Sequence, residues 1–544
     1  MASEVLKKAM SVVGGYLVNN YSNAETGAIN NELQILLGFT PLWKKTDADS
    51  YSYEEMQEFL SVINEKEDIR KAKGVYYTPS DVVRFILSNC FKMACGKLKP
   101  QNIGNTELNE IPYRALCYDK TIYDPTCGSG VFLLAALEMK LDLLKQHNLT
   151  VTRDKIQKVV CSVKGNDLNT DSVAITKLRL FLCILNRFGA EKIKGIAPLI
   201  NNCFTCYDFV AEKPAADSRY DIIIGNPPYV EDSKSDCVPR KKYGNIYANV
   251  LENSAVQLKN GGVLGFVIPL SYVSTPRMKN IRNELYRYVP EQYILSYSDR
   301  PDCLFTSVHQ KLCILFGRNC KMNRTIYTGN YRYWYKEERN ELFGTSAVIK
   351  NPFITDGFIP KLGTDLDKEI YRKIGNKKNS FLQLLEGGNV PVYLNMRAAF
   401  WIKAFQSRHN GSEYKEFKCA DETGADFCFC LLNSSLFWWY WICVSDCWHI
   451  TRKELQSFMV PDIIDSDKAA ELAVKLENRL EETKAYVGTR QTEYEYKHKD
   501  CVAEIGRIDD YINELYGLTL EESRYIREFA YRYRTGGGAA NGRN

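Results

Sequence analysis

The tetrapeptide Asn-Pro-Pro-Tyr at residues 226–229 constrains the fold of this chain more than any other segment. It directly follows the apolar run Asp221 to Gly225, which has the length and composition of a buried strand. Proline lacks a backbone N–H and has a fixed φ, so the prolines end the strand and hold an extended turn at its carboxyl end, where open α/β sheets bind ligands. The Asn226 side-chain oxygen and the Pro227 carbonyl would accept hydrogen bonds from a planar amine beside the Tyr229 ring. For the tetrapeptide alone, an ordinary loop or a polyproline ligand is the alternative.

A second segment, residues 121–134, reads as a strand, a glycine turn and the start of a helix. Gly128 and Gly130 let the backbone approach a ligand, and the helix N-terminus beyond them offers free N–H groups. The spacing lacks the three-glycine dinucleotide pattern, and no Gly-Lys-Ser/Thr follows to bind phosphates. Asp124 at the end of the strand therefore favours a cationic or amine-bearing cofactor over a pyrophosphate.

Carboxylates also follow the next two predicted strands. Residues 159–165 lead to Asp167, just before a helical run, and an acidic residue in this place binds a ribose diol in doubly wound sheets. The alternative is that Asp167 only caps the helix. A further strand is expected to end near Asp208, which would bring a third carboxylate to the same sheet edge.

With these motifs in this order, the chain resembles the gamma-class N6-adenine DNA methyltransferases, which use S-adenosylmethionine, and the methyltransferase and specificity parts of type IIG restriction–modification enzymes. The resemblance implies a doubly wound, seven-stranded Rossmann-like α/β sheet. It covers roughly residues 70–320 and rests on five segments in one order: 73–79, 124–133, 226–229, 261–269 and 304–316.

The resemblance also implies roles for individual residues. Asn226 and the Pro227 carbonyl would accept hydrogen bonds from N6 of a flipped-out adenine, which would stack on Tyr229 and Phe305. Thr78 and Asp124 would hold the methionine part of the cofactor, Asp167 the ribose and Asp208 the adenine amine. The full set of expected cofactor contacts is Tyr77, Thr78, Asp124, Thr126, Gly128, Gly130, Asp167, Asp208, Phe209 and Asn226.

Charge and composition allow a DNA partner without demanding one. The net charge is +5 over 544 residues, so any footprint on double-stranded DNA must be local. The expected DNA contacts are Arg240, Lys241, Lys242, Arg277, Arg397 and Arg452. Only five His residues are present and the 18 Cys are scattered, so no metal site is expected.

The chain divides into four expected regions: a helical segment at 1–70, the methyltransferase domain at 71–325, an α+β target-recognition domain with C-terminal helices at 326–535, and a disordered tail at 536–544. The first segment lacks an Asp…Glu-x-Lys nuclease pattern, so a restriction endonuclease would be a separately encoded partner. Reduced cysteines and the absence of a run of about 18 apolar residues predict a cytoplasmic protein and no membrane span. Trp438, Trp439 and Tyr440 are expected in the core, and one long helix is expected over 466–499.

Two other functions remain open. An Asn-Pro-Pro-Tyr enzyme can methylate a protein glutamine or ribosomal RNA, because both offer a planar NH2 group, but such enzymes usually lack a C-terminal extension of some two hundred residues. A non-catalytic DNA-binding subunit of a restriction complex would be expected to lose Asp124, Asn226 or Tyr229, and all three are present.

Overall fold

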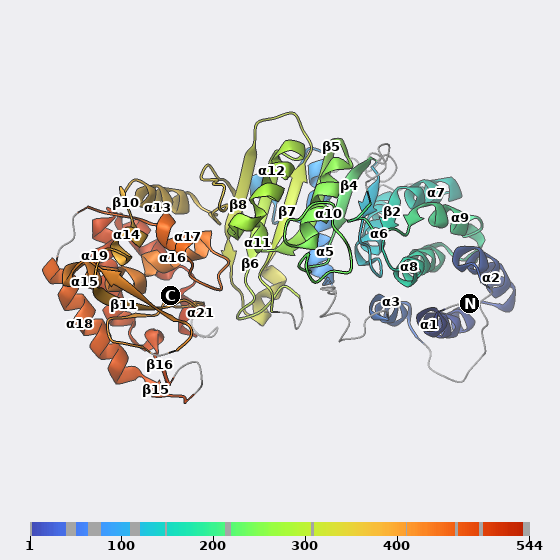
Figure 1. Ribbon diagram of the computed structural model, residues 1–544. Coiled ribbons are helices and arrows are strands. Elements are labelled where there is room, and N and C mark those ends of the chain that lie inside the picture. The colour runs from blue at the N-terminus through green and yellow to red at the C-terminus, as the bar shows by residue number, and fades with distance from the viewer. Residues whose placement is uncertain are drawn as a thin grey trace.

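The computed structural model describes residues 3–39, 51–63, 78–108, 120–146, 150–212, 219–305, 309–409, 411–462, 466–488 and 493–536. A large sheet occupies the middle of an elongated molecule, with helices of the N-terminal half beside one end of the sheet and a C-terminal lobe beside the other (Figure 1). The described part of the chain therefore consists of a sheet-centred domain with a helical N-terminal segment and a separate C-terminal lobe.

The central sheet has nine described strands in the order β3-β2-β1-β4-β5-β7-β6-β8-β9. Strands β7 and β9 run antiparallel to their neighbours, and the other neighbouring pairs are parallel. The strands are β1 (Ile122–Asp124), β2 (Val163–Asn166), β3 (Phe204–Thr205), β4 (Tyr220–Gly225), β5 (Leu258–Pro269), β6 (Glu291–Tyr297), β7 (Leu312–Arg318), β8 (Thr325–Arg332) and β9 (Ile349–Lys350).

Helices cover both faces of this sheet, and the sequence of β4 shows why. Ile222 and Ile224 face one hydrophobic core and Ile223 faces the other, because successive side chains of a strand point to opposite faces. The first core is completed by α5 (Ser80–Ala94), α6 (Val131–Gln146) and α8 (Thr170–Phe188). The second is completed by α10 (Ile246–Val256) and α12 (Lys279–Tyr288), which lie in front of the sheet in Figure 1.

The N-terminal segment is helical, as predicted, and packs on α8 and its neighbours. The Tyr16 hydroxyl donates to Asn186 Oδ1 at 3.0 Å, and buried Glu32 accepts from the backbone N–H of Gly195 and Ala197. Residues 64–69, where a longer third helix was expected, lie outside the described residues. The helices concerned are α1 (Glu4–Asn20), α2 (Asn23–Leu37), α3 (Tyr53–Val62), α7 (Arg153–Cys161) and α9 (Ile196–Asn202).

The C-terminal lobe is built around α16 (Ser435–Val444), all ten residues of which are buried. Trp438, Trp439 and Tyr440 are therefore core residues, as expected. The other helices are α13 (Asp365–Gly375), α14 (Phe381–Leu385), α15 (Glu422–Asn433), α17 (Arg452–Ser457), α18 (Ser466–Thr483), α19 (Val502–Leu515), α20 (Leu520–Glu528) and α21 (Tyr531–Thr535). Three small antiparallel sheets pair β12 (Ala404–Phe405) and β13 (Tyr414–Cys419) with β11 (Val390–Asn395), β10 (Asn379–Ser380) with β14 (Met459–Val460), and β15 (Ala485–Tyr486) with β16 (Tyr494–Glu495).

Among the described residues no single helix has the length and apolarity to cross a membrane; by length and composition the bent pair α15–α16 passes that test only when its two helices are taken together.

Two sequence predictions differ from the structure. The described residues form nine strands of this sheet rather than seven, because β8, which begins at Thr325, and β9 pair onto it. The helix expected over 466–499 ends at Thr483, since Ala485 and Tyr486 pair with Tyr494 and Glu495 in a short hairpin. Thr519 and Glu522 form a capping box at the start of α20. The tail beyond residue 536 lies outside the described residues.

A buried carboxyl group ties the C-terminal lobe together. Asp367, fully buried on α13, accepts hydrogen bonds from Trp439 Nε1 on α16 at 3.3 Å and from the Tyr525 hydroxyl on α20 at 2.7 Å. Its other oxygen accepts from the backbone N–H of Gly363 and Thr364 and from the Thr364 hydroxyl. The Asp367 carboxyl group therefore links three helices. Asn330 of β8 extends this network by donating to the Tyr525 hydroxyl at 3.1 Å.

We expect Asp367→Ala to lower the free energy of unfolding by about 2–6 kcal/mol, because the buried Trp439 N–H and Tyr525 O–H each lose an acceptor at about 1–3 kcal/mol. Asp365→Ala, an exposed position in the first turn of the same helix, should change it by less than about 0.5 kcal/mol. Urea unfolding followed by tryptophan fluorescence measures both. Equal midpoints for the two variants would contradict the bracing role of Asp367.

Candidate active site at the carboxyl edge of the sheet

The carboxyl ends of four neighbouring parallel strands, β3, β2, β1 and β4, meet at one edge of the sheet. Asp124 ends β1, Asp167 follows β2, Asp208 follows β3 and Asn226 follows β4. The structure therefore brings the expected side chains to one edge, as predicted, and places them along it in the order 208, 167, 124, 226. This edge is where doubly wound sheets bind ligands.

The glycine turn after β1 has the backbone conformation that only glycine adopts readily. Gly128 has φ +53° and Gly130 has φ +80°, and a Cβ at Gly130 would overlap the Thr176 side chain of α8. The Thr176 hydroxyl donates to the Gly128 carbonyl at 2.8 Å, and Arg179 donates to the Ser129 carbonyl at 2.6 Å. The turn is thus fixed against α8 and leads directly into α6.

Asp124 is a buried carboxyl group with one backbone donor. Its side chain is 2 % exposed and accepts from the Thr126 N–H at 3.0 Å. Burial raises the pKa of Asp124 to about 8, the nearby Asp167 charge adds to this, and the Thr126 hydrogen bond opposes it. A Cβ at Gly225 would lie 2.9 Å from Asp124 Oδ1, so glycine at the end of β4 leaves room for the carboxyl. A cationic group placed here would restore the charged form.

Asp167 is bound to the glycine turn rather than to the following helix. Oδ2 accepts from the Gly128 N–H at 2.8 Å and Oδ1 accepts from the Asn169 N–H at 2.9 Å, while burial raises its pKa. The cap of α8 is Asn169, whose side chain accepts from the N–H groups of residues 171 and 172. The alternative reading of Asp167 as the helix cap is therefore wrong.

Asp208 and Phe209 close the far end of this row. Asp208 Oδ1 accepts from the N–H groups of Val210 and Ala211 at 2.9 and 3.0 Å, and the Phe209 ring is 3 % exposed in the core. Next to the glycine turn, the Thr126 hydroxyl oxygen is buried and has no hydrogen-bond partner among the described residues. It is a polar atom that a bound molecule could satisfy.

Sequence reasoning assigned no role to Asn166, the last residue of β2. This fully buried amide donates to the carbonyls of Pro125 and Tyr207, and its oxygen accepts from the Thr205 hydroxyl and the Tyr207 N–H. It therefore joins the turns after β1 and β3. The signal in the sequence was an amide side chain at the last position of the strand, directly before Asp167.

The Asn-Pro-Pro-Tyr turn is held by a residue from the other end of the domain. Asn226 Nδ2 donates to the Thr78 hydroxyl at 3.0 Å, and Thr78 lies just before α5. The Tyr229 hydroxyl donates to Asn226 Oδ1 and also lies 2.8 Å from the Val267 carbonyl of β5. The Tyr229 ring is half-buried and packs edge-on against Tyr247 of α10 at 6.5 Å between ring centroids. Two motifs 148 residues apart thus form one corner.

Two expected site residues cannot be placed at this corner. Tyr77 lies outside the described residues. The Phe305 ring is 1 % exposed and lies in the core on the α5 side of the sheet, so it does not present a face to solvent.

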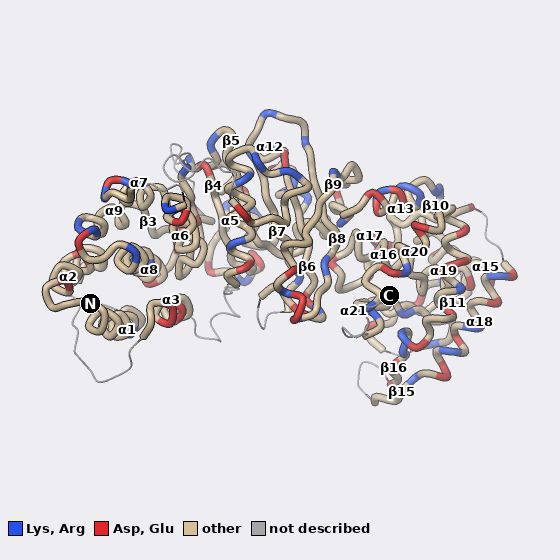
Figure 2. Tube along the Cα trace, turned by 180° about the vertical axis from the view of Figure 1, so that it is seen from behind, with Lys and Arg blue, Asp and Glu red and all other residues tan. Residues whose placement is uncertain are grey.

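The expected DNA contacts fall into two groups. Lys241 is paired with Glu252 and Glu284, and Arg452 forms a two-point ion pair with Glu386, so these charges are already engaged. The others are exposed: Arg240 and Lys242 in the loop after the tetrapeptide, Arg277, whose side chain lies against Gly244 of that loop, and Arg397 in the C-terminal lobe. Figure 2 shows basic and acidic residues interspersed along the molecule, in keeping with the small net charge. No cluster of metal-binding side chains occurs in the part of the chain that the structure describes.

Comparison with known proteins finds a family model and curated relatives that match parts of this chain. Residues 162–299 match the family model described as "Eco57I restriction-modification methylase". The type II restriction enzyme and methyltransferase RM.Eco57I of Escherichia coli is 20% identical over 323 residues, which cover 50% of this chain and 31% of that protein. The type II methyltransferase M.BstVI of Geobacillus stearothermophilus is 24% identical over 188 residues, 32% of each chain. This chain thus spans about a third of the length of these curated relatives.

One solved structure aligns with almost the entire chain. The type IIL restriction-modification enzyme MmeI, determined in complex with DNA, superimposes with a TM-score of 0.54 at 11% sequence identity, covering 98% of this chain and 96% of that chain. The likeness concerns the fold and extends through the C-terminal lobe. Residues 162–299 are thus similar to the Eco57I restriction-modification methylases, and the chain shares its fold over nearly its full length with MmeI.

Proposed function

We propose that this chain is a DNA methyltransferase that transfers a methyl group from S-adenosylmethionine to N6 of adenine at a specific sequence in duplex DNA. The observation that carries the proposal is the corner at the end of β4, where Asn226 is held between Thr78 and Tyr229. Asp124 lies directly beside this corner, against Gly225. A cofactor site and an amine-binding turn therefore share one sheet edge.

The residues of this edge suit S-adenosylmethionine, which supplies an electrophilic methyl group on a sulfonium and carries a charged amine. Asp124, with its raised pKa, gains a counter-charge when a cation binds beside it. The buried Thr126 hydroxyl gains a partner, and the Thr78 hydroxyl lies 3.0 Å from Asn226 Nδ2 at the neighbouring strand end. Asp167 and Asp208, one strand and two strands away, would hold the ribose and the adenine ring.

Asn226 and Pro227 would make a poor nucleophile reactive. The lone pair of an aromatic amine is delocalised into the ring, and acceptors placed on its two N–H bonds localise the pair on nitrogen. Asn226 Oδ1 and the Pro227 carbonyl are such acceptors at the end of a rigid turn. In the structure the Tyr229 hydroxyl donates to Asn226 Oδ1. When the amine of a base binds to Asn226 Oδ1 instead, the Tyr229 hydroxyl still has the Val267 carbonyl as an acceptor at 2.8 Å.

An adenine inside a duplex cannot reach this corner, so it must be flipped out at a cost of a few kcal/mol. The half-buried Tyr229 ring offers it a stacking face. Phe305 could contribute only by leaving its buried position, because its ring is almost inaccessible. We propose duplex DNA as the partner, a cytoplasmic place of action and a restriction–modification role.

Expression in a host without adenine methylation, followed by single-molecule sequencing, tests the proposal and reveals the recognition sequence. We expect N6-methyladenine at one sequence motif. Unmodified DNA, together with transfer of labelled methyl groups to a protein or to ribosomal RNA, would instead support the glutamine or RNA alternative.

We expect Asn226→Ala to reduce methyl transfer at least about 100-fold, because it removes one of the two acceptors that activate the amine. Cofactor affinity, measured by isothermal titration calorimetry, should change less than about threefold. Asn226→Asp keeps an acceptor oxygen and should retain more activity than Asn226→Ala. Wild-type rates in Asn226→Ala would remove Asn226 from the mechanism.

We expect cofactor affinity to rise up to about tenfold from pH 7 to pH 9, because Asp124 with a pKa of about 8 must lose its proton to face a cation. In Asp124→Asn this part of the pH dependence should vanish, and binding should be weak throughout. The same raised pKa makes the protein without cofactor less stable as the pH rises from about 4 to about 8. Calorimetry in buffers of different ionisation enthalpy measures the released proton, and equal proton release by both proteins would contradict the assignment.

A further inference from the structure

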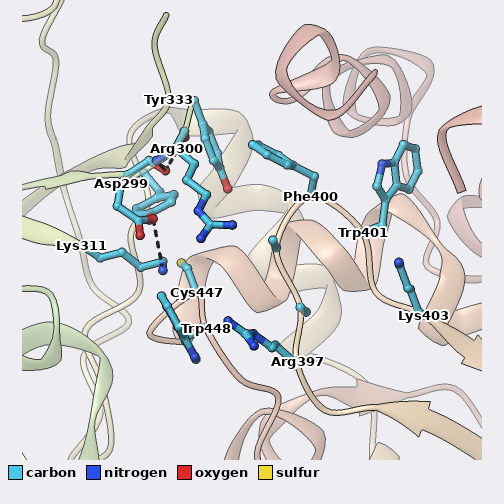
Figure 3. A pocket seen from close by; sticks show the side chains of 14 residues that line it. Asp299, Arg300, Lys311, Tyr333, Arg397, Phe400, Trp401, Lys403, Cys447 and Trp448 are labelled. Atoms are coloured by element: carbon cyan, nitrogen blue, oxygen red, sulfur yellow. Dashed lines mark hydrogen bonds and ion pairs between the residues drawn. The ribbon is translucent and has the colours of Figure 1, made fainter. Parts of the chain in front are cut away.

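A cavity of about 270 Å³ lies between the central sheet and the C-terminal lobe, separate from the corner at Asn226 (Figure 3). One wall comes from the sheet: Asp299 and Arg300 follow β6, Lys311 precedes β7 and Tyr333 follows β8. The other wall comes from residues 397–403, Cys447 and Trp448 of the lobe. Its volume is just below the range of about 300–1,000 Å³ typical of small-molecule pockets, so it suits one small group rather than a long segment.

The lining of this cavity is strongly basic. Its charged side chains are four bases and one acid: Arg300, Lys311, Arg397, Lys403 and Asp299. Lys311 pairs with Asp299 at 3.2 Å, whereas neither Arg300 nor Arg397 has an acidic partner among the described residues. Figure 3 shows the Arg300 guanidinium pointing into the cavity, with Arg397 on the opposite wall. Like charges from two lobes repel across such a space unless an anion enters it.

Aromatic side chains lie beside the basic side chains in the lining of the cavity. The Trp448 ring, 36% exposed, has Lys311 Nζ at 4.1 Å and the Arg397 guanidinium carbon at 5.2 Å from its centroid. Tyr333 and Phe400 lie on opposite walls with ring centroids 5.8 Å apart. Arginines beside flat rings are the combination that binds a phosphate and stacks on a base.

The cavity opens at the same sheet edge as the candidate active site. The carboxyl ends of β4 and β6 lie at one edge of the sheet. Strand β5 is parallel to β4, and β7 is antiparallel to both β5 and β6, so β6 runs in the same direction as β4. Three inter-strand steps of about 4.8 Å separate β4 from β6, so the cavity lies about 15 Å from Asn226. With about 3.4 Å per nucleotide along a strand, a DNA strand whose target base is at Asn226 reaches the cavity about four nucleotides away.

We propose that this cavity is a second nucleotide site, which binds one nucleotide of the substrate DNA away from the target adenine. Arg300 and Arg397, one from each lobe, hold its phosphate, and the Trp448 ring packs against its base, which must leave the duplex stack to reach the ring, as the target adenine does. The inference rests on the proposed function, because it assumes that duplex DNA lies along this edge. It adds a contact that spans the two lobes and fixes the register of the strand.

The first test is the salt dependence of DNA binding, measured by fluorescence anisotropy with labelled 30-base-pair duplexes. Each phosphate contact contributes about 0.9 to the slope of log Kobs against log salt. Arg300→Gln and Arg397→Gln should each lower the slope, and the double variant should lower it by about 1, because the two arginines share one phosphate. The control is Lys145→Gln, which removes one exposed charge near the end of α6, at the opposite edge of the sheet, and should leave the slope unchanged.

The second test locates the base. Trp448→Ala should weaken DNA binding about 5- to 150-fold, as expected for loss of one stacked base, whereas Trp448→Phe should recover most of the affinity. Ultraviolet crosslinking of the full chain to duplexes containing 5-iododeoxyuridine should attach DNA to Trp448, identified by peptide mass spectrometry. KM for DNA should rise in Trp448→Ala in step with its loss of DNA affinity, and Trp448→Phe should bring KM most of the way back.

The outcomes separate this inference from the proposed function. Wild-type salt slopes in both arginine variants, or crosslinks that map only outside the cavity, would overturn the second site while DNA methylation stands. Competition by free dAMP at low concentration, with Trp448 quenching, would show a site for a free nucleotide and would also overturn it. A wild-type protein that binds DNA through the cavity but methylates none would overturn the proposed function alone.

Discussion

The hydrogen bond from Asn226 to Thr78 is the interaction on which the candidate site depends. The prolines fix the backbone of the turn, but they do not orient the Asn226 amide; Thr78 takes its N–H and so aims its oxygen away, toward the Tyr229 hydroxyl. Because Thr78 directly precedes α5, which packs on β4 and β5, the orientation of one amide is linked to the docking of a helix on the sheet. Catalysis by placed acceptors needs this rigidity, since no nucleophilic side chain compensates for a misplaced one.

Asp124 supplies the other half of the site at a cost in stability. A carboxyl group buried with one backbone donor is held mostly protonated near neutral pH, as its pKa of about 8 indicates. Gly225 at the end of β4 leaves space beside this carboxyl group, because a Cβ there would lie 2.9 Å from Asp124 Oδ1. Such unsatisfied groups cluster where a ligand completes them, and the unpartnered Thr126 hydroxyl beside Asp124 follows the same logic.

The sheet edge was predictable from sequence because its signals are local. A strand, a glycine turn and a carboxylate lie within a few residues of one another, and parallel strands bring such segments to one edge whatever the rest of the chain does. What sequence could not give depends on distant partners: the pairing of β8 and β9 onto the sheet, the ion pairs that engage Lys241 and Arg452, and the burial of Phe305. The Thr483 end of α18 was missed because the charged pattern continues into the hairpin that follows.

The attachment of the two lobes explains why the cavity between them can be selective. Asn330 of β8 donates to Tyr525 of α20, which in turn donates to buried Asp367, and one hydrophobic core runs from the sheet into the lobe. The spacing of Arg300 and Arg397 is therefore set by folding and not by the ligand. The folded protein already contains the repulsion between the two arginines, and a bound phosphate relieves it. Because neither lobe has to be ordered when the phosphate binds, this preorganisation raises affinity. A flexible junction would let the arginines move apart, and the register of a bound strand would be lost with them.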